Sequence, residues 1–234
     1  MPDVVGYINS HKAVFDAMQA ASSAVSLIGW LASFGFLLFA WRRGNVASMS
    51  LFGMNVTLAQ KEVAIAMSRA TRERALKDTT RKPGERSQPT ADLDKLNTII
   101  ARAFTPEDQS NLIGRAILWV DDNPTNNDNE ATALRKIGLV VDQVTSTDAG
   151  LSALAHHPYD LVISDMGRGS EKFAGYQLLE AIRKSKNNVP YVLYSAEGSK
   201  PAHRADALSR GALGSTDYPH ELLDLVVSTL GNDR

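Results

Sequence analysis

The stretch "LVISDMGR", residues 161–168, decides the fold class because it carries an apolar run directly into an acidic residue. Leu161 to Ser164 are apolar or small, as in a buried strand, and Asp165 follows at once. The tip of a strand can hold a charged side chain where its middle cannot, because the tip opens to water or to a ligand. Asp165 is therefore either a turn former or part of a site.

Four further apolar runs have the same character, and they alternate with helical patterns. The predicted strands are residues 116–120, 139–144, 161–164, 191–195 and 212–215, and the predicted helices between them are residues 128–137, 147–156, 176–184 and 202–210. Strands that alternate with single helices are typical of right-handed crossovers and of a parallel sheet covered on both faces. We predict that residues 115–234 form one α/β domain, doubly wound around a five-stranded parallel sheet.

Polar residues follow three of these strands, at what should be one edge of the sheet. Asp121 and Asp122 follow the first strand, Asp165 follows the third, and Ser195 ends the fourth. Ligands of such sheets bind beyond the carboxyl ends of the strands. If the strand order is the flavodoxin-like 2-1-3-4-5, the first and third strands are neighbours and the three carboxylates converge. Their repulsion would raise a pKa or require a cation, and hard oxygen ligands suit Mg²⁺.

Four motifs along this edge resemble the receiver domain of two-component response regulators, over Arg115 to Leu230. They are "VDDNP" (120–124), "ISDMG" (163–167), "YSAEG" (194–198) and "GALGSTDYP" (211–219). The resemblance implies that Asp165 is the phosphoacceptor and that Asp121 and Asp122 are the acidic pair around Mg²⁺. It also implies that Gly167 offers a backbone carbonyl to the metal and that Ser195 is the switch hydroxyl that bonds the phosphoryl oxygen.

One departure from the receiver pattern concerns charge. Receivers usually carry a lysine before the proline that follows the fifth strand, and here Tyr218 stands in that place, before Pro219. A lysine there neutralises phosphoryl charge, so its loss removes a fixed cation from an anionic site. Arg168 and Lys172 lie in the loop after Asp165 and are alternative cations, although surface solubility is the simpler interpretation of both.

The N-terminal part predicts a membrane anchor. Residues 17–41 contain no charged residue or histidine. This segment is long enough for a helix to cross the hydrocarbon core, and Arg42 and Arg43 follow it. We predict an N-terminal segment (1–16) and a single transmembrane helix (17–43). The localisation would then be the inner (cytoplasmic) membrane, single-pass and N-out, with the receiver-like domain in the cytosol. Small residues in the helix permit a homodimer. A cleaved signal peptide or a buried core helix fits this composition less well.

The middle of the chain predicts a connector. Residues 44–78 should form a short strand or a hairpin broken at Gly53 (48–58), followed by a helical stalk. Residues 79–90, with Pro83, Gly84 and Pro89, should form a flexible linker. Connector helices are expected over residues 91–114. One of them carries an apolar face that should pack either on the C-terminal domain or on its own copy in a dimer.

Composition excludes several other functions. The net charge is −1, so no global basic field favours nucleic acid, and cysteine is absent, so disulfides and Cys-ligated zinc are excluded. The histidines show no metal-ligand spacing, and no G-x-S-x-G motif hosts a serine nucleophile.

Three functions stay open, none of them an enzyme in the usual sense. The first is a membrane-anchored receiver that is phosphorylated at Asp165 by a histidine kinase or phosphotransfer protein. Its output would be protein contact, because no helix-turn-helix follows residue 230. The second is a pseudo-receiver that binds a protein or small ligand without phosphorylation, which Tyr218 favours. The third is a membrane effector triggered by its cytosolic domain.

Overall fold

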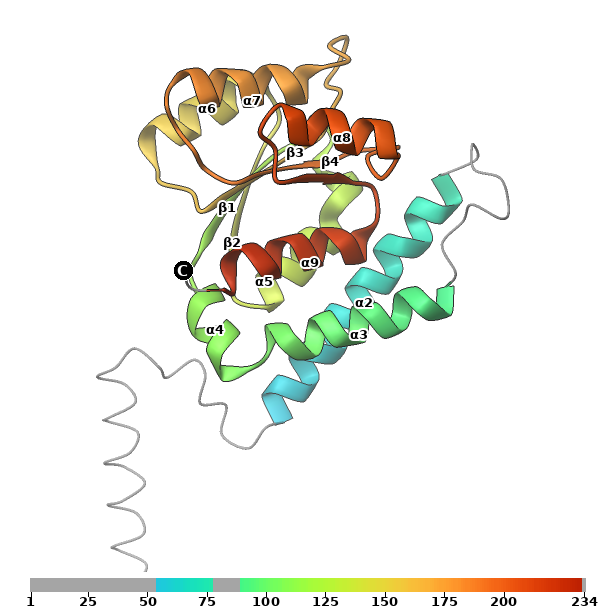
Figure 1. The fold of residues 1–234 in the computed structure, drawn as a ribbon. Coiled ribbons are helices and arrows are strands. Elements are labelled where there is room, and N and C mark those ends of the chain that lie inside the picture. The colour runs from blue at the N-terminus through green and yellow to red at the C-terminus, as the bar shows by residue number, and fades with distance from the viewer. Residues whose placement is uncertain (1–53, 78–88, 233–234) are drawn as a thin grey trace, which may run out of the picture. The chain divides into compact units, whose positions relative to one another are not determined.

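The predicted sheet is present, with the predicted strand order (Figure 1). The computed structural model describes residues 54–77 and 89–232. Its strands are β1 (Ala116–Val120), β2 (Val140–Val144), β3 (Leu161–Ser164), β4 (Tyr191–Tyr194) and β5 (Gly214–Thr216). Every neighbouring pair is parallel, and the order is β2-β1-β3-β4-β5. The prediction of a flavodoxin-like, doubly wound α/β domain is confirmed.

Helices cover both faces of the sheet. They are α5 (Asp128–Lys136), α6 (Thr147–His156), α7 (Ala174–Lys184), α8 (Pro201–Ser209) and α9 (Pro219–Leu230), with a short 3-10 helix, η2 (Pro124–Asn127), ahead of α5. Side chains of β1 alternate between the two faces. Ile117 and Trp119 join the core that α5 and α9 cover, whereas Leu118 and Val120 join the core on the side of α7 and α8. All four are fully buried, so the sheet is enclosed on both sides.

Local signals place the element ends. The hydroxyl of Ser146 accepts the backbone N–H of Ala149 at 3.1 Å and so caps α6. Pro219 occupies the first turn of α9, where its missing N–H costs nothing. Gly138, with φ of +100°, turns the chain from α5 into β2, and a Cβ there would lie 2.9 Å from Ile113.

Three helices of the described residues precede the sheet and pack over the face that α5 and α9 cover (Figure 1). They are α2 (Met54–Lys77), α3 (Pro89–Ala103) and α4 (Pro106–Leu112). Val63 and Met67 of α2 and Leu96 and Ile100 of α3 are buried in the same core as Ile117. Helix α2 is therefore a packed layer of the fold and not the helical stalk that the sequence predicted. The apolar face of α3 packs on the C-terminal domain, one of the two expected neighbours.

The predicted strand at residues 48–58 is wrong where the structure describes it. Residues 54–58 belong to α2, and the preceding ones lie outside the described residues. Helix α2 buries Val63, Ala66, Met67 and Ala70, whose i, i+3, i+4, i+7 spacing is one face of a helix. Burial of that face stabilises the helix through the whole segment and overrides the local β preference.

The predicted transmembrane helix, residues 17–43, lies outside the described residues, as do the N-terminal segment 1–16 and most of the predicted linker 79–90. Within residues 54–77 and 89–232, no helix is both long enough and apolar enough to cross a bilayer. The longest helix described, α2, carries charged side chains along its length, and these are costly in hydrocarbon. The predicted single-pass localisation in the inner membrane is corrected by this finding and is not retained.

Candidate functional site

The strand tips bring the predicted acidic residues to one edge of the sheet. Strands β1 and β3 are neighbours, with Val120 opposite Ser164, so the residues after them leave the sheet side by side. The backbone N–H of Asp165 donates to the carbonyl of Val120 at 3.0 Å, which fixes Asp165 beside the end of β1. Asp121 follows Val120 directly. The juxtaposition predicted from strand order is therefore present.

Asp121 is buried, and both of its carboxylate oxygens accept hydrogen bonds. Oδ1 accepts the backbone N–H of Asn123 at 2.7 Å, and Oδ2 accepts the side-chain amide of Asn127 at 2.6 Å. Burial raises the pKa of Asp121, and these two hydrogen bonds lower it in part. The carboxylate is thus held in one orientation at the base of the site.

Asp165 is half-buried at the tip of β3, and its pKa is raised to about 6. Burial is the largest cause, and the negative charge of Asp121 is the next. The backbone N–H of Met166 and the cation of Arg168 lower this pKa in part. Near neutral pH Asp165 is mainly ionised, in a site that already repels its charge.

The other predicted site residues lie around this pair. Asp122 is exposed, and its Oδ2 accepts the backbone N–H of Gly169 at 2.7 Å, which ties it to the loop after β3. Gly167 is half-buried in the same loop, and Ser195 is buried directly after β4. All the residues predicted from sequence therefore belong to the same edge, although Asp122 is engaged by a backbone donor.

A metal site is not preassembled in the described ranges: there, no group of three or more His, Asp or Glu side chains is arranged closely enough to hold an ion. The donor chemistry nevertheless fits Mg²⁺, because two carboxylates raise each other's energy at one strand edge. Asp122 would join them either through Oδ1, because Oδ2 accepts the N–H of Gly169, or by leaving Gly169.

Arg168 belongs to the site, although the sequence favoured a surface charge over the alternative that it replaces the missing cation. The side chain is buried beneath the loop that follows Asp165. Its guanidinium donates five hydrogen bonds, to Val120 O, Ser164 Oγ, Asp165 O, Thr147 Oγ1 and Ala174 O. Arg168 therefore organises the loop and adds a fixed positive charge beside Asp165. Only its position three residues after Asp165 indicated in the sequence that Arg168 belongs to the site. Lys172, the other basic residue of this loop, is exposed.

Tyr218, in the place of the receiver lysine, follows β5 at the same edge. It is the N-cap residue of α9, and its backbone N–H donates to Thr216 Oγ1 at 3.0 Å. Its ring lies against that of His220, with 5.6 Å between centroids. The structure thus places an aromatic side chain where receivers usually carry a lysine.

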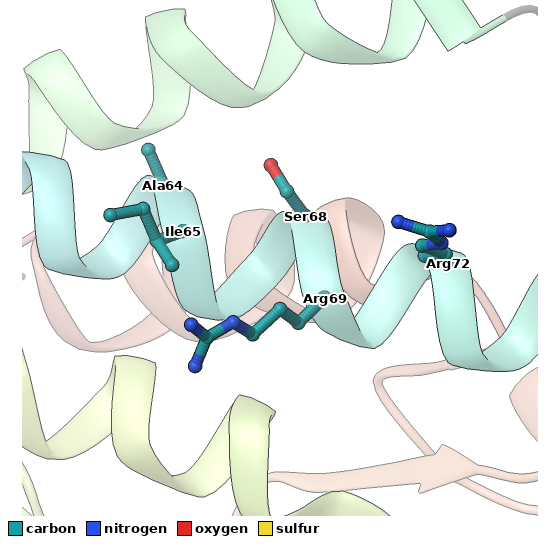
Figure 2. Close-up of a pocket in the computed structure, with 5 residues that line it drawn as sticks. All are labelled: Ala64, Ile65, Ser68, Arg69 and Arg72. Atoms are coloured by element: carbon teal, nitrogen blue, oxygen red, sulfur yellow. The ribbon is translucent and has the colours of Figure 1, made fainter.

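A pocket elsewhere on the molecule lies along α2 and is lined by Ala64, Ile65, Ser68, Arg69 and Arg72 (Figure 2). Its lining comes from one helix and includes no acidic side chain. We therefore assign the site to the strand edge and not to this pocket.

Residues 117–225, slightly less than half of the chain, match the family model of the response regulator receiver domain. This segment is a receiver domain. The family match includes both Asp121 and Asp165, so the resemblance drawn from the four motifs is confirmed for the segment. No curated protein matches the chain.

Several solved structures that are similar to this chain are response regulators or their receiver domains. The receiver domain of the Francisella response regulator 1452 is 19% identical, with a TM-score of 0.45, and the match covers 50% of this chain and 97% of that one. TrrA of Thermotoga maritima, solved in complex with Mg²⁺-BeF, is 26% identical with a TM-score of 0.42, covering 50% and 99%. The chemotaxis response regulator CheY4 of Vibrio cholerae is 19% identical with a TM-score of 0.43, covering 50% and 98%. Because these TM-scores lie below 0.5, we rest the assignment on the family model and on the strand-edge residues.

Proposed function

We propose that the receiver domain accepts a phosphoryl group on Asp165 from a histidine kinase or a phosphotransfer protein, and that its output is contact with another protein. The observation that supports this most directly is the position of Asp165 at the tip of β3, beside Asp121, with its pKa raised by burial and by that neighbour. Burial and the charge of Asp121 raise the energy of the ionised carboxylate, so it gains from transferring part of its charge to a phosphoryl group.

In the proposed transfer, a carboxylate oxygen of Asp165 forms a new bond to phosphorus while the P–N bond of the donor's phosphohistidine breaks. The imidazole nitrogen of the donor keeps the electron pair of the broken bond. The product is an acyl phosphate, and attack by water at phosphorus later restores the carboxylate and releases phosphate.

Mg²⁺ would be held by Asp121, Asp122, Asp165 and the backbone carbonyl of Gly167. When bound, the metal supplies positive charge to the oxygens of the transferring group. The hydroxyl of Ser195, at the end of the neighbouring strand β4, would donate to a phosphoryl oxygen. Arg168 would keep the loop that carries Gly167 in place through its five hydrogen bonds.

Tyr218 favours a site at which phosphoryl transfer to Asp165 is slow or is controlled differently. A lysine in that place would supply a flexible cation, whereas the guanidinium of Arg168 donates to backbone carbonyls and hydroxyls. Arg168 therefore offsets charge at Asp165 without being free to follow the phosphoryl group. We propose that transfer to Asp165 is slow for this reason.

A second candidate function is a pseudo-receiver that binds a protein or small ligand without phosphorylation. Two observations favour it: Tyr218 replaces the lysine, and Asp122 is engaged by the N–H of Gly169. In this alternative the aromatic ring would contact the ligand.

The deciding experiment uses the full chain with Mg²⁺ and a small phosphodonor such as acetyl phosphate, and follows the intact mass. The proposal predicts a Mg²⁺-dependent gain of one phosphoryl group that is absent in Asp165→Asn. Asp94→Asn, an exposed position on α3, should be modified like the wild type. If the wild type gains no phosphoryl group and binds neither Mg²⁺ nor beryllium fluoride, the pseudo-receiver takes its place.

A further inference from the structure

Among the contacts of α2 with the receiver domain, one arginine reaches toward the acidic site. Arg74 Nη2 donates to Asn127 Oδ1 at 2.9 Å, and Nε donates to Glu130 Oε1 at 3.3 Å. The guanidinium also lies over the ring of Tyr194, 3.7 Å from its centroid. Its partners Asn127, Glu130 and Tyr194 are buried to 1% exposure each. This is a specific contact with the domain interior, made by a helix outside the segment that matches the receiver family.

Each partner of Arg74 is connected to a strand tip that carries a site residue. Asn127 donates through Nδ2 to Asp121 Oδ2 at 2.6 Å. Tyr194 is the last residue of β4 and directly precedes Ser195, and its hydroxyl donates to Glu130 Oε1 at 2.6 Å. Only Asn127 therefore lies between Arg74 and Asp121, the proposed metal ligand that follows β1. Arg74 also contacts Tyr194, the residue before Ser195, which carries the proposed switch hydroxyl.

The hydrogen bonds of Asn127 explain how Arg74 orients Asp121. A side-chain amide has one acceptor end and one donor end. Arg74 occupies the acceptor end, so the donor end is the one that faces Asp121. If the amide turned over, its carbonyl oxygen would face the carboxylate and repel it. Partners of this kind, one step behind a metal ligand, fix the ligand's orientation.

We propose that Arg74 is a positioning residue for the acidic site, and that the docking of α2 on the receiver domain is coupled to occupancy of that site. The proposal rests on the proposed function, because it takes Asp121 as a ligand of Mg²⁺. Coupling of this kind is reciprocal: a docked α2 favours the bound site, and a bound site favours a docked α2. A signal that moved α2 would therefore change the affinity of the site.

The test compares the full chain with Arg74→Lys, which keeps the positive charge but lacks the planar fork that reaches Glu130 and Asn127 together. Isothermal titration with Mg²⁺ should show affinity about tenfold weaker in this variant. Amide hydrogen exchange of residues 121–128, measured without metal, should be faster, because the N–H of Asn123 is bonded to the carboxylate that Arg74 orients.

Two controls separate positioning from loss of docking. Arg72→Lys makes the same chemical change at an exposed position of the same helix (Figure 2). Glu62→Gln removes the ion pair between Glu62 of α2 and Lys136 of α5, which lies in the same interface. Both controls should keep the Mg²⁺ affinity and the exchange of residues 121–128 within twofold of the wild type, on the order of an exposed pair's contribution.

A third variant, Asn127→Ala, tests the route of the effect. If Arg74 acts through Asn127, the double variant Arg74→Lys/Asn127→Ala should be no worse than Asn127→Ala alone. Unchanged exchange of residues 121–128 in Arg74→Lys, or an equal change in Glu62→Gln, would overturn the proposal. A wild type that does not bind Mg²⁺ would instead refute the proposed function, and the exchange measurement, which needs no metal, would still decide the role of Arg74.

Discussion

At the scale of single residues, the site is a balance of charges around Asp165. Burial and Asp121 raise its pKa, and Arg168 lowers it in part. Arg168 lies where it can stabilise the ionised carboxylate, yet its hydrogen bonds go to the loop. The domain therefore keeps a destabilised carboxylate at neutral pH, which is characteristic of functional sites.

The raised pKa of Asp165 predicts a gain in stability for Asp165→Asn without Mg²⁺. The folded pKa, about 6, exceeds the ordinary value of 3.8, so the folded state binds the proton more tightly than the unfolded state. The stability that the wild type gains from protonation of Asp165 is lost as pH rises from about 4 to about 6, and above pH 6 it changes no further. Asp165→Asn should be more stable by about 1–3 kcal/mol at pH 7.5 and equal at about pH 4. Urea unfolding at several pH values measures this, and an equal stability at pH 7.5 would contradict it.

Replacement of Tyr218 by lysine should speed phosphorylation of Asp165. In Tyr218→Lys the new ammonium can follow the phosphoryl oxygens, so phosphorylation by acetyl phosphate should be at least about tenfold faster. Tyr218→Phe keeps the ring that lies against His220 and adds no charge, so its rate should match the wild type. Intact-mass time courses give both rates. Equal rates in the wild type and Tyr218→Lys would show that the missing cation does not limit transfer.

At the scale of elements, α2 and α3 add a layer over α5 and α9. The buried face of α2 is made of small and flexible side chains, among them Ala66, Met67 and Ala70. Such residues allow close approach of two helices but give a weak amphipathic pattern, so α2 resembles a solvated helix in the sequence. The ion pairs Lys136–Glu62 and Arg74–Glu130 then fix its alignment with α5.

A core substitution in α2 tests whether this layer belongs to the cooperative unit. Met67 is 1% exposed, so Met67→Ala should lower the free energy of unfolding by about 2–4 kcal/mol through lost burial and a cavity. Leu76→Ala, on the same helix but 73% exposed, should change it by less than about 0.5 kcal/mol. Urea unfolding of the full chain compares them. Similar small effects would mean that α2 unfolds independently of the sheet.

At the scale of the whole described molecule, one hydrophobic core runs from α2 and α3 through α5 and α9 to the sheet. The site lies at the carboxyl edge of that sheet, and Arg74 connects it to the outer layer. Binding at the site should therefore stabilise the sheet and α2 together, because both are parts of one packed unit.

Ligand binding gives the corresponding prediction. With Mg²⁺ and beryllium fluoride at 100 times the dissociation constant, the free energy of unfolding should rise by about 2.7 kcal/mol. Hydrogen exchange of residues 54–77 should slow in the same sample. The stabilisation by beryllium fluoride should be absent in Asp165→Asn, which lacks the ionised carboxylate that would bind it. Stabilisation of the sheet without any slowing in residues 54–77 would argue against coupling of α2 to the site.

The sequence by itself determined the sheet and the acidic edge. Alternating apolar runs and helical patterns predict a parallel sheet, and the carboxyl ends of parallel strands share one edge, so Asp121 and Asp165 converge by topology alone. The motifs around them resemble the receiver family, and the family model confirms this for residues 117–225. These features are local in the chain or follow from strand order, and both can be read from one sequence.

Only the tertiary structure decided the place of α2 and the roles of Arg74 and Arg168. A charged side chain is predicted to be exposed from sequence alone, because its burial requires partners that come from elsewhere in the fold. The partners of Arg74 lie 53 and 56 residues away. Those of Arg168 are mostly carbonyls and hydroxyls, which carry no sequence signal. The predicted stalk and surface arginine were wrong for this reason: which face a helix covers is set by packing between distant segments.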